Sequence, residues 1–228
     1  MNHSPLESTI LFHIGLVPIA RTVVTTWGIM AVVTISCWLA TSSFQIVAGD
    51  WQAVIESVVV GIEEQIQQTV GRDARPFLPL LGTLFIFLVF ANLSGIVPGT
   101  RAPTASIETP AALSMTVFLS VHFFGIRIQG LGPYLESYLK PNPALLPLNV
   151  LSEITRSFSL AVRLFGNIMS DELVLGIIVA LAGLLVPVPM MMLVVLTSLI
   201  QAYIFAILTV VFISAAVRAQ KPSEESPS

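Results

Sequence analysis

The longest uncharged stretch of this 228-residue chain decides what it can fold into. Leu173–Val217 is 45 residues without one charged side chain. As an α-helix this stretch would be about 67 Å long, more than twice the roughly 30 Å thickness of a bilayer's hydrocarbon core. It must therefore turn once, and Pro187–Pro189 is the place where proline favours a break. We expect two long, tilted spans, 149–184 and 190–217, that form a helical hairpin.

The composition points to a membrane protein in the same way. The chain is 55% hydrophobic and 10% charged, whereas soluble domains carry about 25% charged residues. Its 23 charged side chains cannot cover the surface of a soluble protein of this size, which excludes an ordinary cytosolic enzyme and a disordered protein. A net charge of −3 offers no basic surface to nucleic acid. The single cysteine, Cys37, excludes an intrachain disulfide framework and a Cys-rich metal site, and we expect no metal or cofactor.

Three further apolar stretches precede the long hairpin, and each is long enough to cross a bilayer. They are residues 23–45, 77–97 and 109–126. Residues 51–70 differ, because apolar side chains at helical spacing alternate there with Glu and Gln. This pattern predicts an amphipathic helix at the membrane interface or against a partner, with a short soluble connecting helix as the alternative. The predicted fold class is therefore an all-α integral membrane protein with five transmembrane helices and one amphipathic interfacial helix.

The distribution of Lys and Arg predicts the orientation of this single membrane domain, 1–228. Five spans place the two termini on opposite sides. One side carries Arg72, Arg75, Arg127, Lys140, Arg218 and Lys221, and the other carries Arg21 and Arg101. The positive-inside rule then puts the tail, 218–228, in the cytoplasm and the N-terminal segment, 1–22, outside. The N-terminus resembles neither a signal peptide nor a transit peptide, which favours a multi-pass protein of the bacterial plasma (inner) membrane.

The fourth predicted span carries the charged residues that a membrane helix would not need for packing. They are Glu153, Arg156, Arg163, Asp171 and Glu172. A charge near the centre of a span costs about 2.5–3.5 kcal/mol on insertion scales, so each is a candidate for function. The two arginines are seven residues apart and share one helix face, about 10 Å from each other along the axis. Small polar residues fall near the same stripe: Ser152, Ser159, Asn167 and Ser170.

The acids of this span lie on other faces, toward its two ends. An acid near each end with an unpaired cation between them predicts two separated polar pathways and a barrier, rather than one continuous pore. In the fifth span, Gln201 is the one long polar side chain, and we expect it to hydrogen-bond across to the Arg163 stripe. A purely structural bond between helices is the alternative for Gln201. For His122 in the third span we expect a packing or interfacial role.

Several of these residues form a recognisable pattern. The stretch SLAVRLFGN at 159–167, Glu172, and QAYIF at 201–205 resemble subunit a of the rotary F-type ATP synthase. The loop PGTRAPT at 98–104 is similar to that family as well, and the resemblance extends over roughly 70–217. The chain contains no GxxxxGK[ST] phosphate-binding motif, so we expect a non-catalytic subunit without a nucleotide site.

The resemblance implies a membrane stator that faces a ring of c subunits in the Fo sector. Its other partners would be b-type peripheral stalk subunits, further ATP synthase subunits and membrane lipid. Arg163 would be the essential arginine, which attracts the ionised carboxylate of each passing c subunit, favours release of its ion and blocks leakage between two half-channels. Arginine suits this role because it stays charged even in a poor solvent. The transported ion would be H⁺ or Na⁺.

The resemblance also assigns further site residues, one by one. Asn167 and Glu172 match family positions on the half-channel that opens to the outside, and Gln201 matches the glutamine that faces the arginine. Ser159 and Glu153 fall toward the cytoplasmic exit.

Two positions depart from the family pattern. Val194 stands where some relatives place a histidine partner for the glutamate, so a Glu172–His relay at that position does not exist here. Asp171 stands where glycine is frequent. This extra acid either enlarges the polar funnel and favours a cation such as Na⁺, or is a solvated carboxylate at its rim.

Two other classes of protein compete with this interpretation. An autonomous secondary transporter would use Arg163 in a mid-membrane anion site, but such transporters usually show repeated halves with paired broken helices, and this chain shows neither. A purely structural membrane assembly protein is the third class, and the charged stripe of the fourth span weighs against it.

Overall fold

The computed structural model describes residues 10–14, 17–42, 50–70, 75–96, 102–139, 146–182 and 187–218. In this part of the chain, five helices are long and apolar enough to cross a membrane. The chain is therefore an all-α membrane protein, as predicted. A short antiparallel pair of strands, β1 (Ile10–Ile14) and β2 (Val17–Ala20), precedes the helices and was not predicted.

The five long helices follow the expected order along the chain. They are α1 (Arg21–Ser42), α3 (Leu78–Leu93), α4 (Glu108–Gln129), α6 (Leu146–Ala182) and α7 (Pro187–Arg218). A 3-10 turn, η1 (Ser94–Ile96), extends α3, and a second one, η2 (Pro103–Ala105), precedes α4. The last helix begins at Pro187 rather than at residue 190, because proline lacks only an N–H that the first turn of a helix leaves unbonded anyway.

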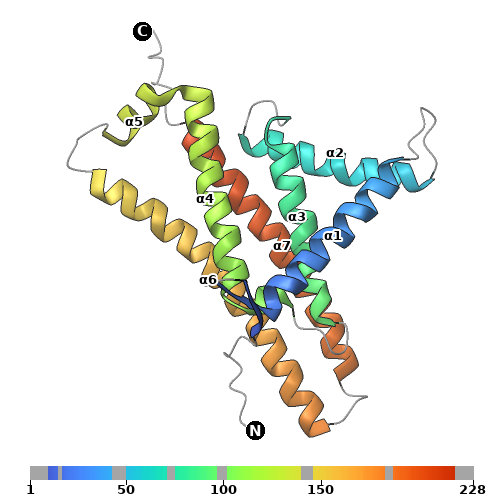
Figure 1. The fold of residues 1–228 in the computed structure, drawn as a ribbon. Coiled ribbons are helices and arrows are strands. Elements are labelled where there is room, and N and C mark those ends of the chain that lie inside the picture. The colour runs from blue at the N-terminus through green and yellow to red at the C-terminus, as the bar shows by residue number, and fades with distance from the viewer. Residues whose placement is uncertain are drawn as a thin grey trace.

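The two remaining helices, α2 (Asp50–Val70) and α5 (Leu131–Leu139), lie at the upper end of the molecule in Figure 1, the end at which α4 leads into α5. α2 forms where the amphipathic helix was predicted, and it runs across the direction of α3 (Figure 1). Its Ile66 and Val70 are buried, whereas Val58 and Val59 are exposed. The C-terminal part of α2 therefore packs on the core of the protein, whereas apolar side chains in its middle stay exposed.

The second of these helices, α5, lies between two predicted spans and was not predicted. Gly130 ends α4 with a φ of +87°, a conformation that favours glycine, and the chain then turns directly into α5. α5 packs closely on α4, because a Cβ added at Gly125 would lie 2.5 Å from Cε2 of Tyr134. This close packing fixes the start of α5 against the preceding span.

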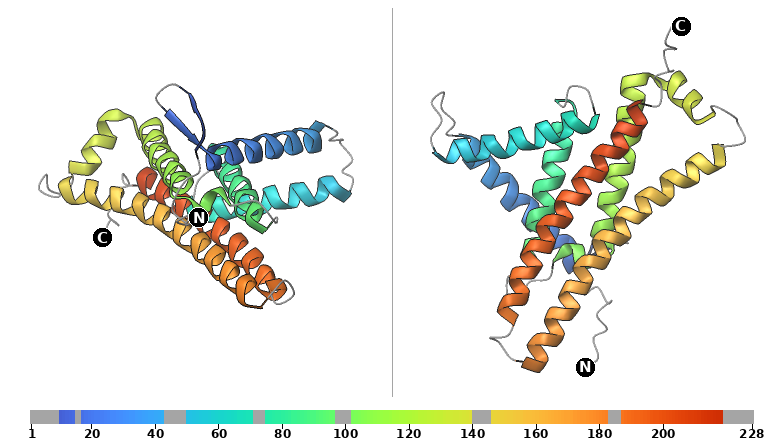
Figure 2. Two further views of the ribbon diagram at one scale, coloured as in Figure 1. Left: turned by 60° about the horizontal axis from the view of Figure 1, so that its bottom comes forward. Right: turned by 180° about the vertical axis from the view of Figure 1, so that it is seen from behind.

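The core lies around α7, which contacts α2, α3, α4 and α6. The core side chains are almost completely buried, among them Leu88 of α3, Leu164 of α6, and Phe205 and Ile213 of α7. Figure 2 shows the C-terminal half of α6 beside the N-terminal half of α7 in both views, whereas the other halves of the two helices diverge. This pair of long helices in contact corresponds to the last two predicted spans, and α6 carries the charged stripe.

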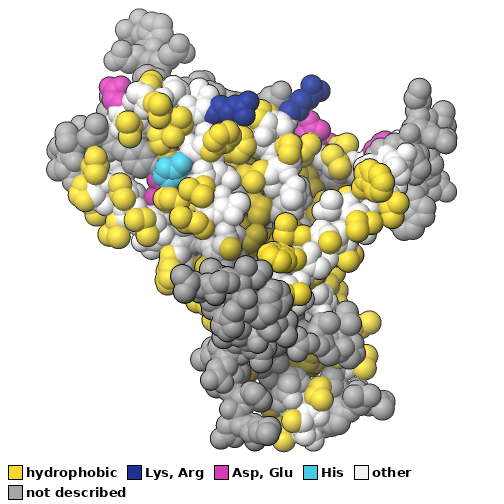
Figure 3. Space-filling view, viewed as in Figure 1, with side chains coloured by type: hydrophobic (Ala, Val, Ile, Leu, Met, Phe, Trp, Pro, Cys, Tyr) yellow, Lys and Arg dark blue, Asp and Glu magenta, His cyan; other side chains and the backbone are white. Residues whose placement is uncertain are grey.

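Much of the apolar surface of the described residues is not covered by the chain itself. α1 contributes no buried residue in its apolar window, and Trp27 and Trp38 are exposed on it. Figure 3 shows hydrophobic side chains spread over the visible flanks, with the Lys and Arg side chains of this face gathered toward the end that carries α5. An exposed apolar surface of this extent suits lipid and partner helices and does not suit water.

Candidate functional site

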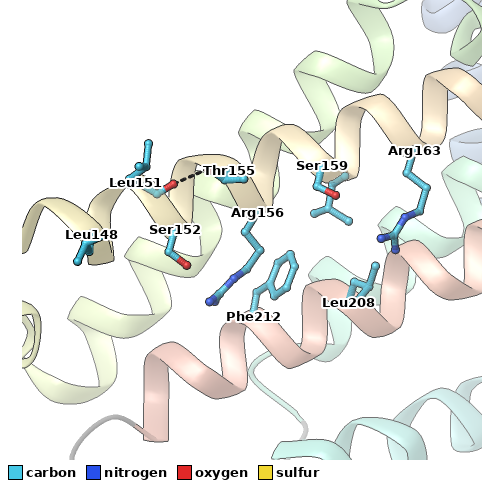
Figure 4. Close-up of a pocket in the computed structure, with 10 residues that line it drawn as sticks. Leu148, Leu151, Ser152, Thr155, Arg156, Ser159, Arg163, Leu208 and Phe212 are labelled. Carbon is cyan, nitrogen blue, oxygen red and sulfur yellow. Dashed lines mark hydrogen bonds between the residues drawn. The ribbon is translucent and has the colours of Figure 1, made fainter. Parts of the chain in front are cut away.

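Arg163 lies near the middle of α6, on the side that faces α7 (Figure 4). Its side chain is exposed, and it forms no ion pair with any residue that the structure describes. It projects at one end of a cleft of about 500 Å³ between α6 and α7. The cleft is lined by Leu148, Leu151, Ser152, Thr155, Arg156, Ser159, Leu160, Arg163, Leu208 and Phe212. An uncompensated guanidinium beside an open cleft is available to an anionic group from outside the chain.

The polar side chains that line this cleft are either positively charged or hydroxylic, and the other half of the lining is apolar. Arg156 projects into it about two turns before Arg163, and its guanidinium carbon lies 5.0 Å from the centre of the Phe212 ring on α7 (Figure 4). Ser159 lies between the two arginines, as the helical spacing predicted. Two arginines and three hydroxyl groups line the cleft, and none of the ten lining residues is acidic.

A hydrogen bond links the two helices on the other side of Arg163. Asn167 Nδ2 on α6 donates to Gln201 Oε1 on α7 over 2.7 Å. Gln201 is only 4% exposed, so its amide is oriented by this bond rather than by solvent. Gln201 is thus hydrogen-bonded to Asn167, a residue of the Arg163 stripe, and this bond fits both roles that the sequence left open for Gln201.

A buried polar network contacts α7 at Ser198, one turn before Gln201. Asn92 Nδ2 on α3 donates to the carbonyl of Ser198 over 3.3 Å, and Asn92 Oδ1 accepts a bond from Thr104 Oγ1 over 2.9 Å. Sequence reasoning missed Asn92 and Thr104. Their signal was the presence of an amide in an otherwise apolar span, which is expensive in lipid unless it is hydrogen-bonded.

The two acids at 171 and 172 are each held by a specific donor. Glu172 Oε1 accepts from the backbone N–H of Ala102 over 3.0 Å, and Asp171 Oδ2 accepts from Thr197 Oγ1 over 3.0 Å. Both line a small cavity of about 20 Å³, together with Asn92, Val194 and Ser198. The Ser198 hydroxyl is buried and has no hydrogen-bond partner in the described part of the chain. The cavity is about the size that a single water molecule requires.

Glu153 lies beside the positive cleft but is not among its lining residues. Its Oε1 is 3.9 Å from Nδ1 of His122 on α4, and the two side chains are 17% and 31% exposed. Nδ1 of His122 is also 2.8 Å from the carbonyl oxygen of Phe118, and its ring packs edge-on near Tyr134. His122 packs at a helix interface, as expected, but no sequence signal pointed to Glu153 as its neighbour, because the two residues lie 31 positions apart on α4 and α6.

The site residues of α6 thus form an ordered series along the helix. A positive cleft lies on the N-terminal side of Arg163, an amide pair follows it, and an acidic pair lies beyond. A multi-helix membrane protein with charged and amide side chains on its longest helix pair is the class that this fold and site define.

Comparisons with known proteins place the chain more narrowly. The family described as ATP synthase A chain matches residues 23–214. "ATP synthase subunit a 2" of Bradyrhizobium sp. (strain BTAi1) is 58% identical over 95% of this chain and 97% of its own length. "ATP synthase subunit a 2" of Pelobacter propionicus is 46% identical over 96% and 99%, and "ATP synthase subunit a" of Albidiferax ferrireducens is 43% identical over 99% and 98%. The chain belongs to the ATP synthase subunit a family, a component of the membrane-embedded Fo sector.

Proposed function

We propose that this chain is the stator ion channel of a rotary F-type ATP synthase. It carries H⁺ or Na⁺ through two half-channels to and from the carboxylates of a c-subunit ring, and so couples ion flow to ring rotation. The observation that carries the proposal is the series on α6: an exposed Arg163, with no ion pair among the described residues, stands at the end of a positive cleft and before an acidic pair. Such a series separates two polar pathways by a fixed charge.

The outer half-channel ends at the acidic pair and the amide pair. A cation that enters from outside meets Asp171 and Glu172 first and then Asn167, whose orientation Gln201 controls. Because the Glu172 carboxylate accepts a backbone N–H and has no histidine at position 194, the Ala102 backbone takes over the orienting role here. The carboxylate is thereby held next to the α6–α7 interface.

The inner half-channel is the cleft that Ser159 and the two arginines line. Arg163 attracts the ionised c-ring carboxylate at close range and favours release of the bound ion into this cleft. Because a guanidinium keeps its charge in a poor solvent, Arg163 also repels cations that would pass directly between the half-channels. Glu153, beside the cleft, serves the same exit from its position next to His122.

The partners follow from the exposed surfaces. The c-ring covers the face of α6 on which the Arg163 side chain is exposed. The uncovered apolar α1 contacts lipid and a b-type peripheral stalk subunit. The cytoplasmic side of a bacterial inner membrane is the end at which α4 leads into α5, where Arg127 lies in the last turn of α4.

Deletion and complementation of this chain test the proposal. A complex assembled without it should hydrolyse ATP but should not move H⁺ or ²²Na⁺ into inverted membrane vesicles, and supplying the chain should restore uptake. ATP-driven ion uptake at the wild-type rate in its absence would refute the proposal. A tag added after residue 228 tests the orientation, because antibody should reach it in inverted vesicles and not in right-side-out ones.

A further inference from the structure

Arg156 is the charged residue of the cleft to which neither the family resemblance nor the proposed channel assigns a role. Its side chain is exposed, projects into the cleft and lies over the Phe212 ring at 5.0 Å. The lining offers it hydroxyl groups but no carboxylate, and the nearest acid on the same helix, Glu153, is instead 3.9 Å from His122 on α4. Arg156 therefore adds a second positive charge to the cleft, about 10 Å along the helix from Arg163.

We propose that Arg156 makes the channel electrostatically asymmetric by lowering the affinity for cations that enter from the cytoplasm. This inference rests on the proposed function, in which the cleft is the cytoplasmic half-channel. An ion that enters from outside meets two acids at 171 and 172, whereas an ion that enters from the cytoplasm must pass a fixed cation. Ion exit to the cytoplasm is favoured by the same charge that opposes ion entry.

The size of the effect follows from Coulomb's law. A unit charge about 4 Å away in bulk water contributes about 1 kcal/mol, which is roughly a fivefold change in local cation concentration. Removing the charge of Arg156 should therefore lower the half-saturating cytoplasmic ion concentration about fivefold. The half-saturating concentration on the outer side should stay within about twofold, because more than a Debye length of about 10 Å separates that entry from Arg156.

A structural role of Arg156 predicts a different pattern. If its stacking on Phe212 serves only to hold α6 against α7, then Phe212→Leu should act like Arg156→Gln, because each removes the same contact. If the charge matters, Phe212→Leu and Arg156→Lys should both keep the wild-type half-saturating concentration, since both retain a cation in the cleft. The two variants thus separate the charge from the contact, whatever they do to the maximal rate.

The experiment uses the complete ATP synthase complex in phosphatidylcholine vesicles. ATP-driven uptake is measured against ion concentration at the cytoplasmic face, and ATP synthesis is measured against ion concentration at the outer face. We expect Arg156→Gln to lower only the first half-saturating value, by about fivefold. An unchanged value, an equal shift on both faces, or the same shift in Phe212→Leu would overturn the inference.

A measurement on the unmodified complex covers the case in which Arg156→Gln does not assemble. Raising the ionic strength with choline chloride from about 0.1 M to about 1 M shortens the screening length from about 10 Å to about 3 Å. The cytoplasmic half-saturating concentration should then fall, and a constant value would overturn the inference. Arg163→Ala in the same vesicles tests the proposed channel separately. The expected result there is loss of coupling between ATP hydrolysis and ion uptake, not a change in the half-saturating ion concentration.

Discussion

The hydrogen bond between Asn167 and Gln201 offers the most quantitative test of how the two halves of the long hairpin cooperate. It joins Nδ2 and Oε1 over 2.7 Å, and its acceptor lies on a side chain that is only 4% exposed. Interhelical hydrogen bonds in membrane proteins contribute about 0.6 kcal/mol on average and up to about 1.7 kcal/mol. If the bond is fully formed in the rate-limiting state, its loss slows transport roughly threefold to nearly twentyfold.

The suitable perturbation is a double-mutant cycle with Gln201→Met, Asn167→Ala and the double variant. Methionine keeps an unbranched side chain of similar length, so the packing of the buried position changes less than it would with alanine. The assay is ATP-driven ion uptake by the complete complex in vesicles, normalised to the amount of assembled complex. We expect the double variant to be no slower than the slower single variant, because both substitutions break one bond.

Multiplicative effects of the two substitutions would refute this reasoning. They would mean a coupling free energy of zero, and Gln201 and Asn167 would then act independently despite their contact. An effect of Gln201→Met alone, with none of Asn167→Ala, would assign the role of Gln201 to packing.

Three further predictions concern neighbouring residues. Glu172→Gln should slow ion flux while leaving assembly intact, because the amide oxygen can still accept from the Ala102 N–H; unchanged flux would make Glu172 structural. Asp171→Asn should slow flux less than Glu172→Gln under both H⁺ and Na⁺ gradients, since only Glu172 matches a family position on the outer half-channel, while the amide of Asn can still accept from Thr197; a larger loss confined to Na⁺ would instead assign Asp171 to ion selection. Gly125→Ala should destabilise the α4–α5 junction, because its Cβ would lie 2.5 Å from Tyr134; protease cleavage near α5 should become faster, and an unchanged rate would contradict the packing.

The long hairpin was predictable from the sequence because its cause is local. An uncharged stretch more than twice as long as a bilayer is thick has to turn, and the prolines at 187 and 189 narrow the place, although they lie in the first turn of α7 rather than in the break itself. The amphipathic helix was predictable for a similar reason, since its apolar side chains recur at helical spacing. The shared face of Arg156, Ser159 and Arg163 follows directly from 3.6 residues per turn.

The remaining features depend on contacts between distant segments. Glu172 could be predicted as a site residue, but nothing in the sequence shows that the backbone N–H of Ala102, seventy residues earlier, donates a hydrogen bond to its carboxylate. Glu153 was expected at the cytoplasmic exit. Which residue its side chain contacts depends on how α4 packs against α6, and this packing brings it next to His122. The helix α5 was missed because Gly130 and Pro133 read as loop residues, although they end one helix and lie in the first turn of the next.

Ion-coupled ATP synthesis by an Arg163→Ala complex tests the central claim most directly. The matched control is Arg127→Ala, which removes an exposed arginine at the end of α4, outside the cleft. In vesicles energised by an ion gradient and a membrane potential, the account predicts no coupled synthesis with Arg163→Ala and synthesis close to the wild-type rate with Arg127→Ala. Full coupled synthesis by Arg163→Ala would contradict the account.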